Sequence, residues 1–105
     1  MRLIVTRPEP DASRTAQALM ALGHEAILSP MLDIFPARDV RLLQHTLQAV
    51  LVTSSNAVRA LALHPERGAL LDLPLLAVGD RTALEARRAG FAAARSAGGA
   101  LDDLL

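Results

Sequence analysis

The sequence contains no cysteine and no lysine, and its only aromatic residues among Phe, Tyr and Trp are Phe35 and Phe91. Without cysteine, the chain has no thiol nucleophile, no disulfide and no thiolate metal site. Without lysine, it can form no Schiff base and has no Walker A lysine. The scarcity of aromatic residues disfavours a β-sandwich. These absences exclude several large classes of enzyme.

The charges are balanced, because eleven arginines face eleven acidic residues. This balance gives no basic surface for nucleic acid, so we expect no nucleic-acid partner. No apolar run is long enough for a signal peptide or a membrane span, which predicts a cytoplasmic protein with no membrane partner. The 105 residues, 51% of them hydrophobic, suffice for one small domain or part of a larger one.

Short apolar segments alternate with segments of helical periodicity along the chain. The pattern predicts strands at 2–6, 25–28, 49–52, 74–78 and 91–94, and a third extended piece at 32–35. It predicts helices at 11–22, from 39 through 47, from 53–56 through 61, from 79–80 to 90, and at 100–105, with a turn or short helix at 65–72. This alternation predicts an α/β fold in which helices flank a parallel sheet.

Local signals predict how several of these elements begin and end. Asp11 or Ser13 can cap the first helix, and Gly23 stands where a left-handed residue ends it. Thr82 and Glu85 have the spacing of a capping box. The segment 49–52 is entirely apolar, as in a strand buried on both faces. Because the leucines of the last helical pattern have nothing after them to pack against, we expect the sequence to be the N-terminal part of a longer protein.

The strongest candidate for a binding site is the polar run Thr53-Ser-Ser-Asn56, which follows an apolar strand and opens a helix. A helix N-terminus presents free backbone N–H groups and the positive end of the helix dipole to a phosphate or a carboxylate. In an open parallel sheet, ligands bind at the carboxyl ends of the strands, where this run lies. The alternative is plain N-capping by Ser54 or Ser55.

Two further strand ends carry residues of the same kind. Arg7 follows Thr6 at the end of the first strand and can pair bidentately with a carboxylate, or it is simply a solvated loop arginine. Gly79 permits close approach to the backbone after strand 74–78, and Thr82 can cap or donate a hydrogen bond. Capping alone is the alternative explanation for this third strand end.

The remaining polar residues give no support for a metal, a nucleotide or a nucleophile. There is no GxGxxG or Walker A motif, and the serines at 54 and 55 lack the glycines of a nucleophile elbow. Asp102 and Asp103 are better explained as a solvated helix face than as a metal pair. No metal-ligand spacing connects the three histidines, His24, His45 and His64.

In order and spacing over nearly the whole chain, the sequence resembles the uroporphyrinogen-III synthase family. The matching segments are Leu3-Ile-Val-Thr-Arg-Pro8, Leu22-Gly-His-Glu25 with Pro30, Leu51-Val-Thr-Ser-Ser-Asn-Ala-Val58, Ala77-Val-Gly79 with Thr82, and Gly90-Phe91. Members of that family usually have more than twice this length, so the resemblance covers only the N-terminal part of such an enzyme, and the chain would be a truncated form.

The resemblance implies two α/β domains joined by a two-stranded linker, with the active site in the cleft between them. Residues 1–34 would form the N-terminal segment of a discontinuous first domain. Residues 35–37 would belong to the linker, and residues 38–105 to an incomplete second domain.

The resemblance also implies a reaction. The family is a hydro-lyase family of haem and tetrapyrrole biosynthesis, which closes hydroxymethylbilane, a linear tetrapyrrole octacarboxylate, to uroporphyrinogen III with inversion of ring D and loss of water. It requires no metal and no organic cofactor. The carried-over substrate-binding residues are Thr6, Arg7, Ser54, Ser55, Asn56 and Gly79, and Thr82 is the candidate catalytic residue, as a proton-handling group. The Asp80-Arg81 dipeptide is a departure from the family pattern. The acidic residue expected after the glycine is present as Asp80, but the following Arg81 would simply be solvated.

A different class of function fits the same strand ends. A non-catalytic α/β module could bind a small anionic ligand or a partner protein there. In either case, an incomplete first domain would leave the strand at 2–6 with an unpaired edge and an exposed apolar face, which predicts self-association.

Overall fold

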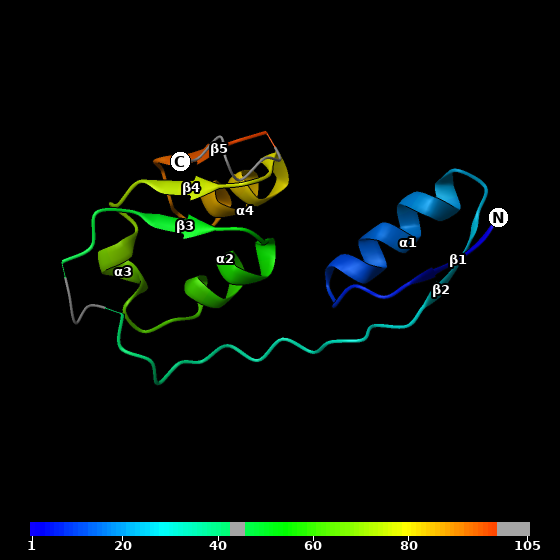
Figure 1. The fold of residues 1–105 in the computed structure, drawn as a ribbon, viewed down its shortest axis with the longest axis horizontal. Coiled ribbons are helices and arrows are strands. Elements are labelled where there is room, and N and C mark those ends of the chain that lie inside the picture. Colours follow the sequence, from blue (N-terminus) through cyan, green and yellow to red (C-terminus); the bar gives the residue numbers. More distant parts are fainter. Residues whose placement is uncertain (43–45, 99–105) are drawn as a thin grey trace. The chain divides into compact units, whose positions relative to one another are not determined.

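The computed structural model describes residues 1–42 and 46–98. The chain divides into two compact units, Met1–Phe35 (unit 1) and Pro36–Leu105 (unit 2). Along the chain, one helix separates the two parallel strands of unit 1, and helices alternate with parallel strands in unit 2 (Figure 1). The predicted α/β class, with helices flanking parallel sheets, is therefore confirmed.

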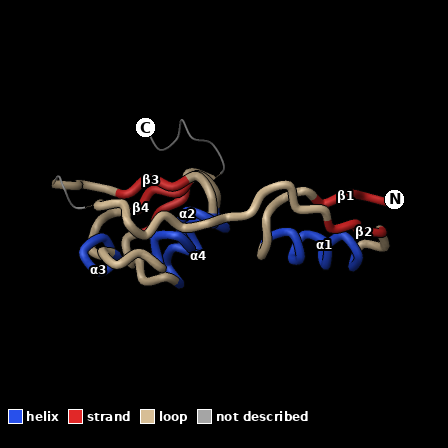
Figure 2. Tube along the Cα trace, turned by 90° about the horizontal axis from the view of Figure 1, so that it is seen from below, coloured by secondary structure: helices blue, strands red, loops and turns tan. Residues whose placement is uncertain are grey.

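Unit 1 is a β-α-β structure with one helix on one face of a two-stranded sheet (Figure 2). Strands β1 and β2 are parallel, and Ile4 lies opposite Ile27. Val5 is buried together with Ala12 and Ala16 of the helix, whereas Ile4 and Ile27 are exposed on the other face of the sheet. The elements of unit 1 are β1 (Arg2–Val5), α1 (Asp11–Ala21) and β2 (Glu25–Leu28).

The start of α1 is capped differently from the prediction. Pro10 is the residue before the helix, and neither Asp11 nor Ser13 caps it. Instead, the Glu9 carboxylate accepts hydrogen bonds from the backbone N–H of Ser13 at 3.2 Å and from its hydroxyl at 2.9 Å. The prediction for the other end is confirmed, since Gly23 has a φ of 86°, a conformation that side chains disfavour.

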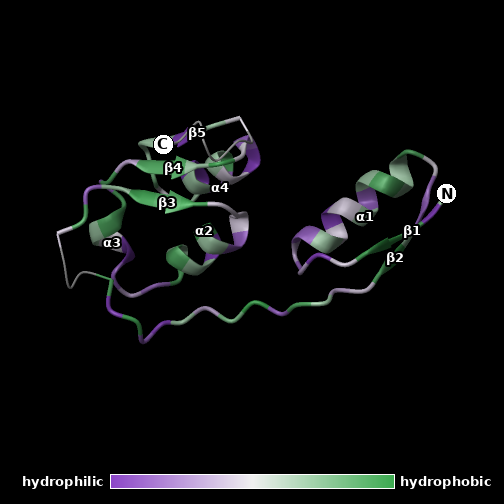
Figure 3. Ribbon diagram, in the orientation of Figure 1, coloured by the Kyte–Doolittle hydropathy of each residue, from purple (hydrophilic) through white to green (hydrophobic). Residues whose placement is uncertain are grey.

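Unit 2 contains a three-stranded parallel sheet in which β4 (Leu75–Ala77) lies between β3 (Val50–Val52) and β5 (Ala94–Ser96). Its helices lie on one face of the sheet (Figure 2). Figure 3 shows β3 and β4 in hydrophobic colours, in agreement with their place beside the core. The elements are β3 (Val50–Val52), α2 (Ser55–Ala62), α3 (Arg67–Leu70), β4 (Leu75–Ala77), α4 (Asp80–Arg88) and β5 (Ala94–Ser96).

A single hydrophobic core holds the sheet and helices of unit 2 together. Leu75 and Ala77 of the central strand are fully buried, as are Ala83 and Ala86 of α4. Phe91 is also fully buried, and its backbone N–H donates to the Ala86 carbonyl oxygen at 3.0 Å. Phe91 therefore ends α4 and fills the core at the same time.

Some expected elements are absent or displaced in the described part of unit 2. β5 lies at 94–96 and not at 91–94, because Phe91 packs in the core before the strand begins. The strand 49–52 was expected to be buried on both faces, but Leu51 is half-exposed, because no described helix covers that face. The predicted last helix, 100–105, lies outside the described residues.

The segment between the two β-α-β patterns also differs from the prediction. Residues 32–35 belong to no strand. No helix forms in the described residues 39–42 and 46–49, while Leu43, which was expected on that helix, is not described. The physical reason is that long-range partners hold this backbone. The Val40 carbonyl accepts from His64, and the Leu42 N–H donates to Glu66.

Candidate functional site

The carboxyl ends of three strands meet at one edge of the unit 2 sheet. The strands are parallel neighbours, and Val52, Ala77 and Ser96 are paired across the sheet at these ends. The arrowheads of β3 and β4 point the same way in Figure 1. We call this the carboxyl edge and define it by residues 53–56, 78–82 and 96–98. Helices α2 and α4 both begin at it.

At the first strand end, Ser54 is the N-cap of α2. Its backbone is extended, with φ −147° and ψ 154°, and its Oγ accepts a hydrogen bond from the Ala57 N–H at 3.3 Å. Capping by Ser54 is therefore real, yet it satisfies only one of the backbone N–H groups that a helix leaves open at its start. No acidic residue stands in the first turn of α2, so no side chain of that turn neutralises the positive end of the helix dipole.

Asn56 is turned toward its own helix. Its Oδ1 accepts a hydrogen bond from Arg59 Nη2 at 2.7 Å. The amide nitrogen of Asn56 is thus oriented by an arginine one turn later, and the side chain is half-buried. This arrangement leaves a donor of fixed direction at the carboxyl edge.

At the second strand end, Gly79 precedes α4 with a φ of −108° and a ψ of 157°. This is extended backbone that any residue adopts, and a Cβ added here would meet no atom within 4 Å. The fold therefore does not require glycine at this position. The open space beside the Gly79 backbone would allow a ligand to approach the start of α4 closely.

The predicted capping box of Thr82 and Glu85 is wrong. Thr82 is the third residue of α4, where it cannot be the N-cap. Arg81 is exposed, as expected, and it also pairs with Glu85, with 3.2 Å between its Nη2 and the Glu85 Oε1. The first turn of α4 thus has a different arrangement from the one the spacing indicated.

Thr82 and Ser55 meet inside the carboxyl edge. The Ser55 Oγ lies 3.4 Å from the Thr82 Oγ1, within hydrogen-bonding distance. Ser55 is 8% exposed and Thr82 is 7% exposed. Two buried hydroxyls therefore connect the first turns of α2 and α4.

Sequence reasoning missed Ser96 at the third strand end. Its hydroxyl donates to the Asp80 Oδ1 at 2.5 Å and accepts from the Gly98 N–H at 3.0 Å. Asp80 stands in the first turn of α4, where a negative charge is favourable. A strand placed at 94–96 would have put Ser96 at the carboxyl end of the third strand, so the misplaced strand hid it.

Thr6 and Arg7 belong to unit 1, at the carboxyl end of β1. Arg7 is anchored on α1, because its Nη1 donates to Thr15 Oγ1 at 3.0 Å and its Nη2 lies 3.6 Å from Asp11 Oδ2. Arg7 is therefore fixed by these two contacts and is not a freely solvated arginine, although its side chain is still half-exposed. The structure thus groups Ser54, Ser55, Asn56, Gly79 and Thr82 at one edge, and Thr6 with Arg7 at another strand end.

The histidines have structural partners or lie outside the described residues. His24 Nδ1 is 3.1 Å from the N-terminal nitrogen, and His64 is buried between Val40 and Glu66. His45, like Asp102 and Asp103, falls outside the described ranges. Within residues 1–42 and 46–98, no three His, Cys, Asp or Glu side chains gather as a metal site would require.

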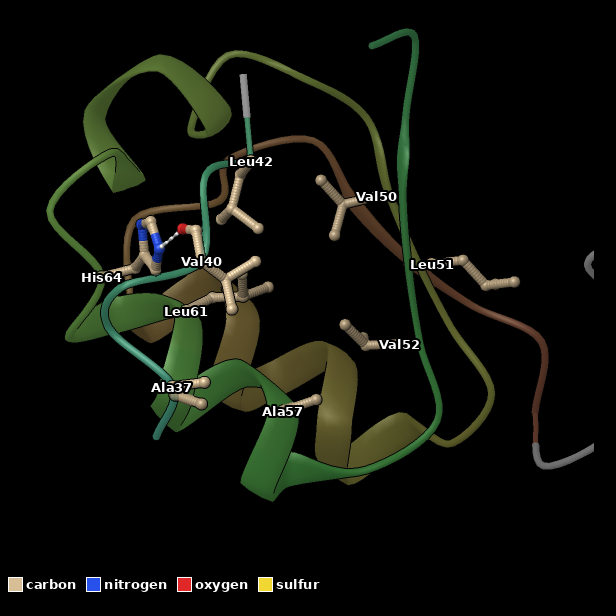
Figure 4. A pocket seen from close by; sticks show the side chains of 10 residues that line it. Ala37, Val40, Leu42, Val50, Leu51, Val52, Ala57, Leu61 and His64 are labelled. Carbon is tan, nitrogen blue, oxygen red and sulfur yellow. Dashed lines mark hydrogen bonds between the residues drawn. The ribbon is translucent and has the colours of Figure 1, made fainter. Parts of the chain in front are cut away.

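Unit 2 also contains a cavity of about 410 Å³ between β3, α2 and the segment that enters the unit (Figure 4). Val50 and Val52 point toward it, while Leu51 points away. The lining is aliphatic apart from His64, whose ring nitrogens already have partners. Such a cavity suits no highly charged ligand, which favours the carboxyl edge as the functional site.

Comparison with models of known protein families matches residues 13–105 to the family described as uroporphyrinogen-III synthase HemD. The matched range contains the whole carboxyl edge. A search among curated proteins found no match. In the described residues, no helix is long and apolar enough to cross a membrane.

Proposed function

Because this chain belongs to the uroporphyrinogen-III synthase family, we propose that it serves in closing hydroxymethylbilane to uroporphyrinogen III, with inversion of ring D and loss of water. The family is a hydro-lyase family of tetrapyrrole biosynthesis. The observation that carries the proposal is the family match across 13–105, which contains two helix N-termini joined at one sheet edge. A cytoplasmic location stays a prediction.

The chemistry asks for binding more than for acid–base catalysis. The linear substrate is reactive and closes unaided to the wrong isomer. The protein must hold one conformation and stabilise a cationic intermediate, which are contributions of proximity and electrostatics. No metal and no organic cofactor are needed for such a role.

The carboxyl edge offers the groups that bind substrate carboxylates. We propose that one carboxylate lies at the start of α2, where Ser54, Ser55 and Asn56 provide hydroxyls, an amide and backbone N–H groups. Gly79 gives a second carboxylate room beside the backbone at the start of α4. Neutral donors of this kind suit a ligand that carries eight negative charges, because they bind several carboxylates without requiring as many cations.

Thr6 and Arg7 provide the contribution of unit 1. Arg7 is held on one side by Thr15 and Asp11, and its half-exposed guanidinium can still donate hydrogen bonds to a carboxylate. We propose that residues 1–34 belong to a discontinuous first domain, that 35–37 are linker, and that 38–105 belong to the second domain. Thr82 is the hydroxyl for which a proton-handling role was predicted, and that role stays a prediction.

Self-association is a second part of the proposal. The β1–β2 sheet leaves Ile4 and Ile27 exposed on the face opposite α1. Apolar side chains on an open two-stranded sheet favour pairing with another chain. We expect light scattering to report a mass above that of the monomer, and a monodisperse monomer at high concentration would contradict this expectation.

The test of the proposed reaction is an isomer assay. Hydroxymethylbilane is supplied to the purified chain and to the longest available protein that carries it, and the oxidised products are separated into type I and type III. We expect type III above the spontaneous background from the longer protein. Type I alone from that protein would overturn the proposal, and binding of uroporphyrin without any type III would favour an anion-binding module.

A further inference from the structure

We infer that Ser55 and Thr82 form one positioning pair, which sets the spacing of the α2 and α4 N-termini for a ligand with several carboxylates. The inference rests on the proposed function and deepens it, because it assigns Thr82 a role through Ser55 and not through direct contact with substrate. The juxtaposition of the two hydroxyls at 3.4 Å, one from each helix, carries it.

The burial of the two side chains separates them from the rest of the carboxyl edge. Ser55 and Thr82 are both less than a tenth exposed. Ser54 and Asp80, their neighbours in sequence or on the same turn, are exposed. A ligand at this edge therefore meets the exposed residues first, while the buried pair lies behind them.

The pair joins two elements that follow adjacent strands. Ser55 is the first residue of α2 after β3, and Thr82 is in the first turn of α4 after β4. The neighbours Val58 and Ala83 are fully buried in the same core, so both first turns rest on packed side chains. A bond between these turns fixes how far apart the open N–H groups of the two helices stand.

Removing one hydroxyl has a different consequence from removing both. A single change leaves the partner hydroxyl buried without its bond, which costs more than replacing both partners by apolar groups of similar shape. The helix starts then shift, or water enters, until the remaining hydroxyl is satisfied. Removing both hydroxyls leaves no unpaired hydroxyl behind, but the bond between the two helix starts is absent as in the single variants. The structure thus predicts that the two substitutions are strongly non-additive.

The test is a double-mutant cycle in the isomer assay with Thr82→Val, Ser55→Ala and the combination of both. We expect each single change to raise KM about tenfold with a smaller effect on kcat, as the loss of one hydrogen bond between buried partners implies. The double variant should lose no more than the worse single variant, because either substitution already removes the one bond between the two helix starts. Thr82→Ser, which keeps the hydroxyl, should rescue the loss, and Thr46→Val is the matched exposed control.

Two results would overturn the inference. Losses that multiply in the double variant, with kcat reduced and KM unchanged, would show that Thr82 acts on the substrate itself. The second result needs no activity, since Thr82→Val should shift the backbone amide resonances of Ser55, Asn56 and Ala57 across the helix interface. Unchanged resonances at these residues would show that the starts of α2 and α4 are not coupled. If only the proposed reaction is wrong, no protein will yield type III, but Thr82→Val will still shift these amide resonances.

Discussion

The Nε2 of His64 lies 2.7 Å from the carbonyl oxygen of Val40, so a buried imidazole between α2 and α3 holds the segment that enters unit 2 (Figure 4). The His64 Nδ1 accepts a hydrogen bond from the Glu66 N–H at 3.0 Å. An acceptor at Nδ1 leaves Nε2 as the donor, which defines the neutral tautomer. The Glu66 carboxylate adds a second bond by accepting from the Leu42 N–H at 2.6 Å.

His64→Ala is expected to destabilise unit 2. The substitution leaves the Val40 carbonyl and the Glu66 N–H without their partner, which costs on the order of 1 kcal/mol because these groups are only partly buried. Urea unfolding followed by circular dichroism measures the change. His24→Ala is the control, because His24 is only half-buried and should change stability by less than about 0.5 kcal/mol. Equal effects of the two substitutions would contradict the clamping role of His64.

The alternation of strands and helices could be predicted from the sequence because it rests on local signals. The strand 25–28 lies where the apolar pattern placed it, and α2 and α4 start directly after apolar strands. Gly23 ends its helix as the residue type requires. In each case the residues that determine the structure are neighbours along the chain.

The failures have the opposite origin, since long-range contacts decide them. His64 and Glu66 bind the backbone 24 residues before them, and this overrides the helical spacing from Asp39 onward. Phe91 was interpreted as a strand residue, but the core of unit 2 takes it up at the end of α4. The Ser55–Thr82 contact spans 27 residues, and no pattern within either helix indicates it.

Gly79→Ala should affect ligand binding without a large effect on the stability of the fold. The Gly79 backbone is already in a conformation open to any residue, and the added Cβ meets no atom within 4 Å. We expect the free energy of unfolding to change by less than about 1 kcal/mol, because the smaller number of unfolded conformations of alanine is offset by its poorer fit at the N-cap. If a carboxylate approaches this backbone, the methyl group will raise KM in the isomer assay.

Gly90→Ala is the matched control for this position. Gly90 has a φ of 105°, and a Cβ there would lie 3.4 Å from Leu71 Cδ2. This substitution should lower stability by more than about 1 kcal/mol. A Gly79→Ala variant that is as unstable as Gly90→Ala would show that glycine serves the fold at position 79.

Asp11→Asn should loosen unit 1. The Asp11 side chain is nearly fully buried and forms ion pairs with Arg14 and Arg7. Both arginines are partly exposed and therefore screened by solvent, so we expect a loss at the lower end of the range for charged hydrogen bonds, about 1–2 kcal/mol. Hydrogen exchange measured on peptides from residues 1–35 reports the loss locally. Asp33→Asn, at an exposed position, should leave that exchange unchanged.

Ser54 allows the charge of the carboxyl edge to be changed without removing the cap of α2. Aspartate and asparagine are both as good at the N-cap as serine, so Ser54→Asp and Ser54→Asn should each keep stability within about 0.5 kcal/mol. Their charges differ, and Ser54 is exposed at the start of a helix whose first turn has no acidic residue. Ser54→Asp places a negative charge where we propose that a substrate carboxylate binds.

The two variants therefore give opposite expectations for binding. Ser54→Asp should weaken the binding of uroporphyrin, an octacarboxylate, by tenfold or more, on the order of 1.4 kcal/mol at low ionic strength. Ser54→Asn should bind within about threefold of the unchanged protein, since it keeps an uncharged cap. Because added salt screens the repulsion, the difference between the variants should shrink as ionic strength rises. Equal affinities at low salt would place the carboxylates of the ligand away from the start of α2.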